Sequence, residues 1–128
     1  MKLVAGIAVG VVLFVGLVAV TSAPRESAES SHRTTTIILE DLRFVPNRID
    51  ARVGVPATVV VTNRGTERHD LSFPSLHMPG LQGVEAILEP GESRTITLTF
   101  KQRGTHTFIC TLPGHAAAGM TGAAFVAP

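Results

Sequence analysis

Apolar and polar side chains alternate strictly through residues 94–100, which have the sequence RTITLTF. Ile96, Leu98 and Phe100 fall on one face of an extended chain, and three threonines fall on the other. A period of two is typical of a β-strand with one buried face. We therefore expect residues 94–100 to form a strand whose apolar face contributes to the core of an all-β domain.

Short strand candidates continue on both sides of this segment. Turn sequences containing Gly, Pro or Asn separate them, and we find no internal repeat and no convincing helix. The alanines at 116–118 are flanked by glycines and would make one helical turn at most. Seven short strands within about 95 residues favour an antiparallel β-sandwich. The six further candidates are residues 34–40, 48–53, 57–62, 69–73, 105–110 and 122–126.

The chain begins with an apolar stretch. Residues 3–20 carry no charged or strongly polar side chain, and at about 1.5 Å per residue they would make a helix of roughly 27 Å, close to the thickness of a bilayer core. The small residues 21–23 favour a signal-peptide cleavage site. The apolar run is longer than the usual signal core of about 7–15 residues, which favours a membrane anchor. Pro24, directly after the small residues, also favours an anchor.

Both alternatives predict an extracytoplasmic location, in the periplasm or at the cell surface. If the segment 3–20 is not cleaved, it holds the protein in the cytoplasmic membrane. We expect an apolar helix within residues 1–23, a flexible polar linker over 24–33 and a single domain over 34–128.

Composition excludes several classes of protein. The net charge is +1, from 11 basic and 10 acidic residues, and no basic stripe is present, so we expect no nucleic-acid partner. The single cysteine excludes an internal disulfide framework and any four-cysteine zinc or iron–sulfur site.

Three metal-ligating residue types follow one another at the end of the chain. Cys110, His115 and Met120 are spaced five residues apart, between two strand candidates, and His69 lies upstream beside the turn at 63–65. Two imidazoles and a thiolate in one plane, with a weak axial thioether, form a mononuclear blue copper site. Thiolate and thioether favour Cu(I), whereas imidazole suits both oxidation states. The sequence therefore predicts one bound copper ion.

The segment 108–122, FICTLPGHAAAGMTG, resembles the copper loop of the plastocyanin/azurin, or cupredoxin, family, and residues 61–71 resemble the family's first-histidine segment. The Cys–His–Met spacing is similar to that of rusticyanin and auracyanin, and the resemblance covers roughly residues 37–126. It implies a Greek-key β-sandwich that binds one copper ion and carries single electrons. It also implies equatorial ligands at His69, Cys110 and His115, with Met120 as the axial ligand.

Residues around these ligands carry weaker signals. In the family, an asparagine before the first histidine ties the two ligand segments together, and Asn63 matches it, although a plain turn residue explains it equally well. Thr111 either caps the loop or ends a strand. Strand alternation points Asp70 away from the face of His69, so the partner of the second His69 nitrogen is not identified. His106 is expected in the core or at its rim.

The copper loop contains no charged residue after the histidine. Pro113, Gly114 and residues 116–119 would surround His115 with a small, neutral, apolar patch, where we expect redox protein partners to dock with little salt dependence. The alternative is that the alanines only pack the loop.

Two other functions compete with electron transfer. A copper-delivery or copper-resistance protein is the main alternative, although such sites are rich in Met or His and this chain has only three methionines. His77 and Met78 are expected to be loop residues, with transient Cu(I) binding as a lesser alternative. No His-X-His pair is present for further copper sites and no acidic residue is evident to orient a Cys–His pair, so we expect no enzyme activity.

Overall fold

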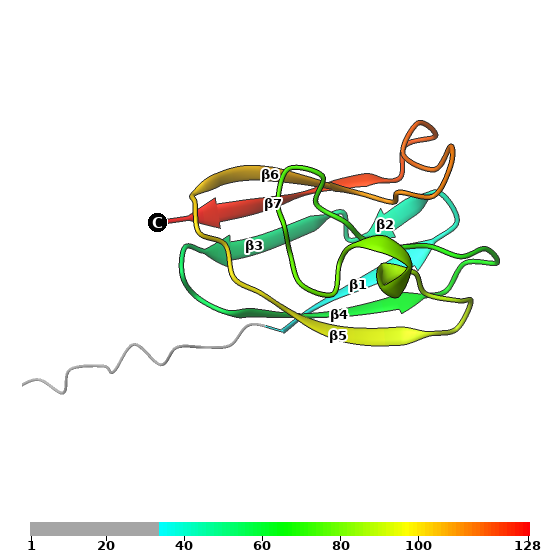
Figure 1. Ribbon diagram of the computed structural model, residues 1–128, viewed down its shortest axis with the longest axis horizontal. Helices are drawn as coiled ribbons and strands as arrows, with labels where there is room; N and C mark the ends of the chain where they lie inside the picture. Colours follow the sequence, from blue (N-terminus) through cyan, green and yellow to red (C-terminus); the bar gives the residue numbers. More distant parts are fainter. Residues whose placement is uncertain (1–33) are drawn as a thin grey trace, which may run out of the picture.

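Two β-sheets packed face to face form the domain in the computed structural model, which describes residues 34–128 (Figure 1). The predicted leader and linker lie outside the described residues. Among the residues that are described, no helix has the length and apolar character to cross a membrane.

The first sheet has the order β2-β1-β4-β5 and the second has the order β3-β7-β6. A short 3₁₀ helix, η1, covers Gly83–Ala86. The strands are β1 (Thr34–Glu40), β2 (Arg43–Val45), β3 (Arg48–Arg52), β4 (Ala57–Asn63), β5 (Ser93–Leu98), β6 (Gly104–Ile109) and β7 (Thr121–Ala127).

The all-β prediction is confirmed, but the prediction of a purely antiparallel sandwich is wrong. Strand β1 pairs in parallel with β4, and β3 pairs in parallel with β7. The chain leaves the first sheet after β2, forms β3 in the second sheet and returns as β4, so β1 and β4 run the same way. Alternation of side chains is the same in parallel and antiparallel strands and does not predict direction.

The predicted strand at 69–73 is also wrong. This segment makes only two isolated bridges, one between His69 and Leu88 and one between Ser72 and Ile109. The backbone of His69 pairs with Leu88, beside the first sheet, and the backbone of Ser72 pairs with Ile109 of β6 in the second sheet. Each pairing lasts for a single residue, so no continuous strand forms. The three-residue strand β2 was not predicted, because three residues are too few to show a period.

Apolar side chains from both sheets fill the space between them. The predicted inward residues Ile96, Leu98 and Phe100 are buried. Phe73 makes edge-on contacts with the rings of Phe100 and Phe108, each with ring centroids 5.6 Å apart. Such aromatic pairs add to the burial of apolar area that stabilises the fold.

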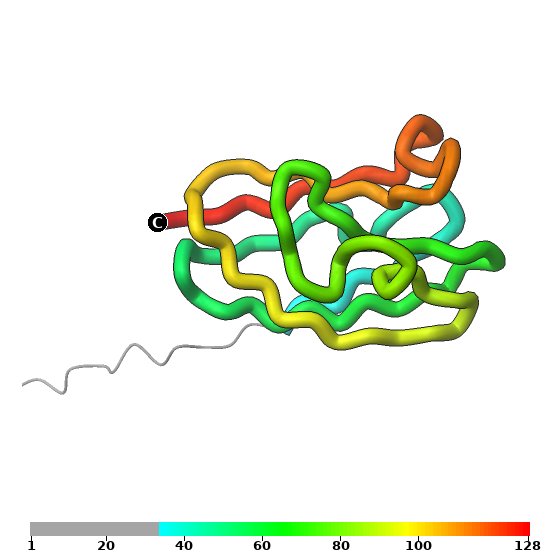
Figure 2. The backbone as a smooth tube through the Cα atoms, viewed as in Figure 1, coloured from blue at the N-terminus to red at the C-terminus, as the bar shows by residue number. Residues whose placement is uncertain are grey.

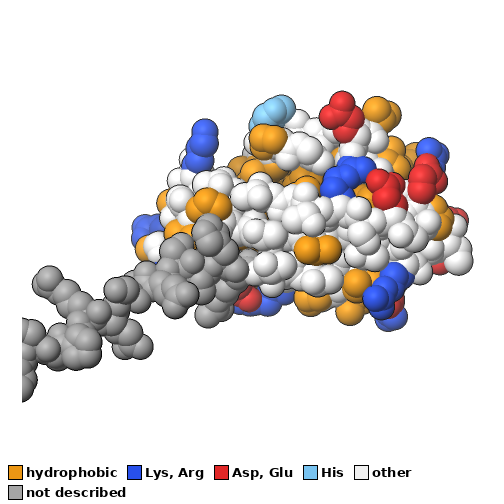
Figure 3. All heavy atoms as spheres, turned by 90° about the horizontal axis from the view of Figure 1, so that it is seen from below, with side chains coloured by type: hydrophobic (Ala, Val, Ile, Leu, Met, Phe, Trp, Pro, Cys, Tyr) orange, Lys and Arg blue, Asp and Glu red, His pale blue; other side chains and the backbone are white. Residues whose placement is uncertain are grey.

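Three connections gather at one end of the sandwich (Figure 2). They are the turn between β1 and β2 at 41–42, the loop after β4 at 64–68 and the loop between β6 and β7 at 110–120. On the face seen in Figure 3, basic and acidic side chains of the described residues are interspersed without a continuous patch of one sign. The three connections bring segments that are distant in the sequence together at one end, and this end is the candidate site.

Candidate metal centre

The structure brings together three of the four predicted ligands. One ligand atom from each of three residues lies within 4.8 Å of the other two: a ring nitrogen of His69, Cys110 Sγ and a ring nitrogen of His115. The side chains of His69 and Cys110 are fully buried. His69 follows the loop after β4, whereas Cys110 and His115 belong to the loop after β6. The site therefore joins the two sheets at one end of the domain.

The three donor atoms have the spacing of a metal site. The His69 Nδ1 to His115 Nδ1 distance is 3.2 Å, and Cys110 Sγ lies 4.0 Å from His69 Nδ1 and 3.5 Å from His115 Nδ1. The in-plane point equidistant from all three atoms is about 2.1 Å from each, within the range of about 2.0–2.3 Å typical of metal–nitrogen and metal–sulfur bonds. One metal ion fits between them without movement of the donors.

Met120, the predicted axial ligand, is fully buried at the end of the same loop. Its backbone carbonyl accepts a hydrogen bond from Cys110 N at 3.1 Å, and its N–H donates to His115 O at 3.0 Å. The loop is therefore closed on itself by the backbone of its three predicted ligands.

Two opposing effects act on the Cys110 thiol. Burial is the largest cause and raises its pKa, as does the Asp70 carboxylate, while hydrogen bonds from the backbone N–H groups of Asp70 and Leu112 lower its pKa. A buried thiol of raised pKa stays protonated in the metal-free protein near neutral pH. Metal binding would displace that proton and give the thiolate that the N–H groups stabilise.

A direct hydrogen-bond link joins the two ligand segments. The buried Asp70 carboxylate accepts hydrogen bonds from Thr111 N at 2.6 Å and from the Thr111 hydroxyl. Asp70 and Thr111 directly follow the candidate ligands His69 and Cys110 in the sequence. Thr111 is therefore a loop anchor, and Asp70 is its partner, which the sequence did not indicate.

Asn63 does not make the link that the resemblance implied. Its buried amide donates to Glu67 O at 2.8 Å and Leu88 O at 2.9 Å, and its Oδ1 accepts from Gly65 N at 2.9 Å. These bonds shape the loop that leads to His69. The hydrogen bonds between the ligand segments come from Asp70 instead, because Asp70 lies next to Thr111 in the loop that begins at Cys110.

The partner of the second His69 nitrogen is Asp41. Its Oδ1 lies 3.1 Å from His69 Nε2, and this hydrogen bond is the main cause that lowers the Asp41 pKa to about 2. The sequence missed Asp41 because it lies 28 residues from His69 and on a different turn. Only pairing of β1 with β4 brings the turn after β1 beside the loop after β4.

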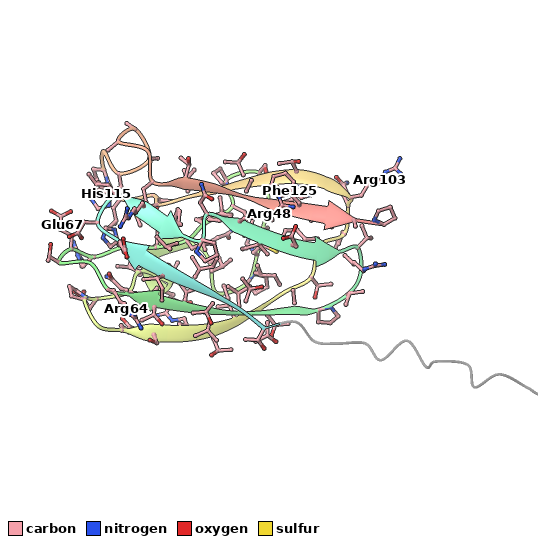
Figure 4. All side chains as sticks on the ribbon, turned by 180° about the vertical axis from the view of Figure 1, so that it is seen from behind. Arg48, Arg64, Glu67, Arg103, His115 and Phe125 are labelled. Carbon is pink, nitrogen blue, oxygen red and sulfur yellow. The ribbon has the colours of Figure 1, made fainter. Side chains whose placement is uncertain are left out.

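The outer nitrogen of His115 also meets a carboxylate. His115 Nε2 lies 3.1 Å from Glu67 Oε2, and Figure 4 shows the two side chains together at one end of the domain. Five of the predicted patch residues are exposed around this histidine, and Ala116 is partly buried. The exposed residues are Pro113, Gly114, Ala117, Ala118 and Gly119.

The other two histidines of residues 34–128 lie outside this cluster. His106 stacks on Phe100 with ring centroids 5.6 Å apart, and its Nε2–H donates to Gln102 O at 3.1 Å, so it sits at the rim of the core as expected. His77 is exposed and Met78 is buried, both in a loop.

Comparisons with known proteins agree with this geometry. Auracyanin-B of Chloroflexus aurantiacus is 36% identical over 72 residues, which cover 56% of this chain but only 31% of auracyanin-B. The copper-resistant cuproprotein CopI of Rubrivivax gelatinosus is 30% identical over 110 residues, covering 74% of this chain and 67% of CopI. A dithionite-reduced auracyanin from Roseiflexus castenholzii has a similar structure, with a TM-score of 0.64 and 26% identity over 74% of this chain and 97% of that chain.

The sequence match to the family is longer than the matches to these relatives. Residues 10–121 match the cupredoxin-like domain, and that stretch contains every predicted ligand. The chain therefore belongs to the cupredoxin family, with an auracyanin-like relationship.

Proposed function

We propose that this protein carries single electrons at a type 1 copper site. His69, Cys110 and His115 are the equatorial ligands, and Met120 is the axial ligand. The observation that carries the proposal is the point about 2.1 Å from all three equatorial donor atoms. When bound, copper supplies a one-electron Cu(II)/Cu(I) couple.

The chain contributes a donor set that need not rearrange. Backbone bonds tie Cys110 to Met120 and Met120 to His115, and the Asp70–Thr111 link fixes this loop against the His69 segment. Close packing allows little movement of such buried donors. A frame that holds the same positions in both oxidation states favours rapid electron exchange.

Electrons enter and leave, in this proposal, through the edge of His115. Its side chain is 12% exposed, whereas that of His69 is fully buried, so His115 is the shorter route to a partner. The exposed small residues at 113–119 let the surface of a redox protein approach closely. We assign redox protein partners to this patch.

We also assign the domain to the outside of the cytoplasmic membrane. The support is the apolar stretch 3–20, followed by the polar linker 24–33. This assignment places residues 34–128 in the periplasm or at the cell surface, either released or tethered by residues 1–23.

Copper resistance is a second candidate function. The likeness to CopI, a copper-resistant cuproprotein, favours it. A protein that sequesters or delivers copper must exchange the metal, whereas a carrier must retain it through many redox cycles. Release of Cu(I) to a strong chelator therefore separates the two: slow release supports the carrier, and release within the mixing time supports copper handling.

The first experiment adds one equivalent of Cu(II) to the purified full-length chain and records visible absorption and electron spin resonance spectra. We expect an intense thiolate-to-copper band and a narrow copper hyperfine splitting, both lost in Cys110→Ser. An ordinary tetragonal Cu(II) spectrum that survives this substitution would overturn the proposal.

A matched pair of substitutions tests the axial ligand. Met120 and Met78 are both buried methionines, but only Met120 belongs to the ligand loop. Met120→Leu should shift the thiolate band and raise the reduction potential, because a weak donor is lost. Met78→Leu should leave both unchanged.

A further inference from the structure

We infer that Asp41 is a positioning residue that orients His69 and strengthens it as a copper donor, so that its carboxylate lowers the reduction potential of the site. The inference rests on the proposed copper function. It goes beyond the ligand set, because Asp41 lies on another turn and acts only through His69.

The first support is the orientation of the His69 ring. Nε2 faces Asp41 Oδ1 at 3.1 Å, while Nδ1 faces the other two donor atoms. A carboxylate accepts only, so Nε2 carries the proton and Nδ1 keeps its lone pair for the metal. A histidine whose outer N–H donates to a carboxylate is a stronger metal ligand than one that donates to water.

The second support is that Asp41 is itself held in place. Its Oδ1 accepts from Thr66 N at 2.9 Å, and its Oδ2 accepts from Thr66 Oγ1 at 2.8 Å. Glu67 N lies 3.4 Å from Oδ1. Bonds to both oxygens restrict rotation of the carboxylate, although the side chain is 44% exposed. A fixed charge acts on the site without the cost of ordering it when metal binds.

The third support is the backbone of Gly65, which packs against the pair. A Cβ at this position would stand 2.3 Å from Asp41 Oδ1 and 2.7 Å from His69 Nε2. Only glycine allows the chain to approach so closely. Gly65 N–H donates a hydrogen bond to Asn63 Oδ1 at 2.9 Å, which holds this turn against the Asp41–His69 contact.

The fourth support is strain in the turn that presents Asp41. Leu42, the next residue, has φ of 63°, and it is the one non-glycine residue with positive φ among residues 34–128. A left-handed conformation is strained for a leucine, because its Cβ approaches the following carbonyl oxygen. Such strain persists where surrounding contacts fix the backbone, as they do at the turn that places the Asp41 side chain beside His69.

Electrostatics gives the direction of the effect. A negative charge beside the site favours the oxidation state of higher positive charge, which is Cu(II). Removing the charge therefore weakens Cu(II) binding more than Cu(I) binding, and the reduction potential rises. If the Cu(II) affinity falls tenfold more than the Cu(I) affinity, the reduction potential of this one-electron couple rises by about 59 mV.

The test uses Asp41→Asn in the full-length, copper-loaded chain. Asparagine keeps an oxygen that can accept from His69 Nε2–H but removes the charge. We expect a higher reduction potential, with a thiolate band and a folded protein similar to wild type. Asp41→Ala removes the acceptor as well, and its Cu(II) affinity should fall about 10–100-fold.

Asp50→Asn is the matched control. Asp50 pairs with Arg48 on β3, which lies away from His115 in Figure 4. Its substitution should leave the potential unchanged. A potential that is equal in wild type, Asp41→Asn and Asp50→Asn would overturn the inference while leaving the copper site intact.

A second readout needs no metal. In the metal-free chain, at a pH where both imidazoles are neutral, ¹⁵N shifts of the His69 ring should show the proton on Nε2 in wild type and Asp41→Asn. The Asp41→Ala protein should show a mixture of the two tautomers. A wild-type ring protonated on Nδ1 would contradict the positioning role even if copper binds.

The failure of the two proposals can be distinguished. If wild type shows no thiolate band with Cu(II), the proposed function fails, and the effect of Asp41 on the potential fails with it. If wild type is blue but Asp41 changes neither the potential nor the tautomer, only the present inference fails.

Discussion

The two histidines of the candidate centre have the same kind of contact in different surroundings. His69 Nε2 and His115 Nε2 each lie 3.1 Å from a carboxylate oxygen, of Asp41 and Glu67 respectively. Both oxygens of the Asp41 carboxylate accept hydrogen bonds from Thr66, and its partner His69 is fully buried. The Glu67 side chain is 64% exposed, against 44% for Asp41, and its carboxylate contacts the partly exposed His115.

Equal distances therefore do not give the two carboxylates equal influence on their histidines. Exposed charges are screened by water and salt, and holding a long side chain in place costs conformational entropy. A fixed carboxylate beside a buried ring keeps its influence. We therefore expect the His69 side to set the properties of the site and the His115 side to handle contact with partners.

Asp70→Ala should have the largest effect, because it cuts the link between the two regions. Thr111 loses two hydrogen bonds to a buried carboxylate, so the free energy of unfolding of the metal-free chain should fall by about 2–3 kcal/mol. Urea unfolding measures this change. Asp70→Asn, which keeps an acceptor for Thr111 N–H, should lose less. Equal stability of wild type and Asp70→Ala would show that the link is not needed.

Gly65→Ala should disturb only the His69 side. The added methyl overlaps Asp41 Oδ1 and His69 Nε2, so we expect a stability loss of about 1–3 kcal/mol and a drop in Cu(II) affinity of about 10–100-fold. Calorimetry and a copper titration measure the two effects.

Gly122→Ala is the control for a steric clash elsewhere. Gly122 lies on β7 rather than in the loop at 64–68, and its methyl would stand 2.2 Å from the Phe108 ring and 2.7 Å from Asn47 O. It should destabilise the fold with a smaller change in copper affinity. If both variants lose copper affinity equally, the close approach at Gly65 has no special role.

Ala117→Glu should act only on the His115 side. Two copies of the copper-loaded protein that exchange electrons through this patch would each carry a new negative charge, so the self-exchange rate should fall about tenfold at low salt and recover at high salt. Magnetic resonance line broadening measures this rate. Ala127→Glu, at the far end of β7, should leave it unchanged. An unchanged rate in Ala117→Glu would rule out docking at the patch.

Glu67→Gln should have the smallest effect. Loss of a contact to an exposed carboxylate changes stability by at most about 1 kcal/mol. The reduction potential should rise less than in Asp41→Asn, and salt should remove the difference from wild type. Voltammetry at low and high salt compares the two variants. A larger shift in Glu67→Gln than in Asp41→Asn would reverse the comparison.

Much of the fold could be predicted, because burial on one face leaves a local period of two. The strand at 94–100 was predicted to within two residues at either end of β5, and its three apolar residues are buried. The segment 69–73 has a similar pattern, but its residues pair with two different partners. All five residues of this segment are buried, so its alternation predicted neither the burial of both faces nor the strand that lies alongside.

The candidate site divides in the same way. The order and spacing of Cys110, His115 and Met120 predicted a shared loop, and the structure brings His69 to two of them. No local pattern marks Asp41 or Glu67, since an acidic residue in a turn is ordinary on any surface. Their roles depend on contacts between turns that are distant in the sequence.

The residue types of the candidate donors, their order and most of the strands follow from the sequence alone, because they depend on residue chemistry and on periodic burial. The carboxylate that contacts each histidine, and the Asp70–Thr111 hydrogen bonds between the two ligand segments, depend on tertiary contacts. Parallel pairing of β1 with β4 places the Asp41 turn beside the His69 loop. Hydrogen bonds across that gap have a range of about 3 Å, so they exist only once the strands have paired.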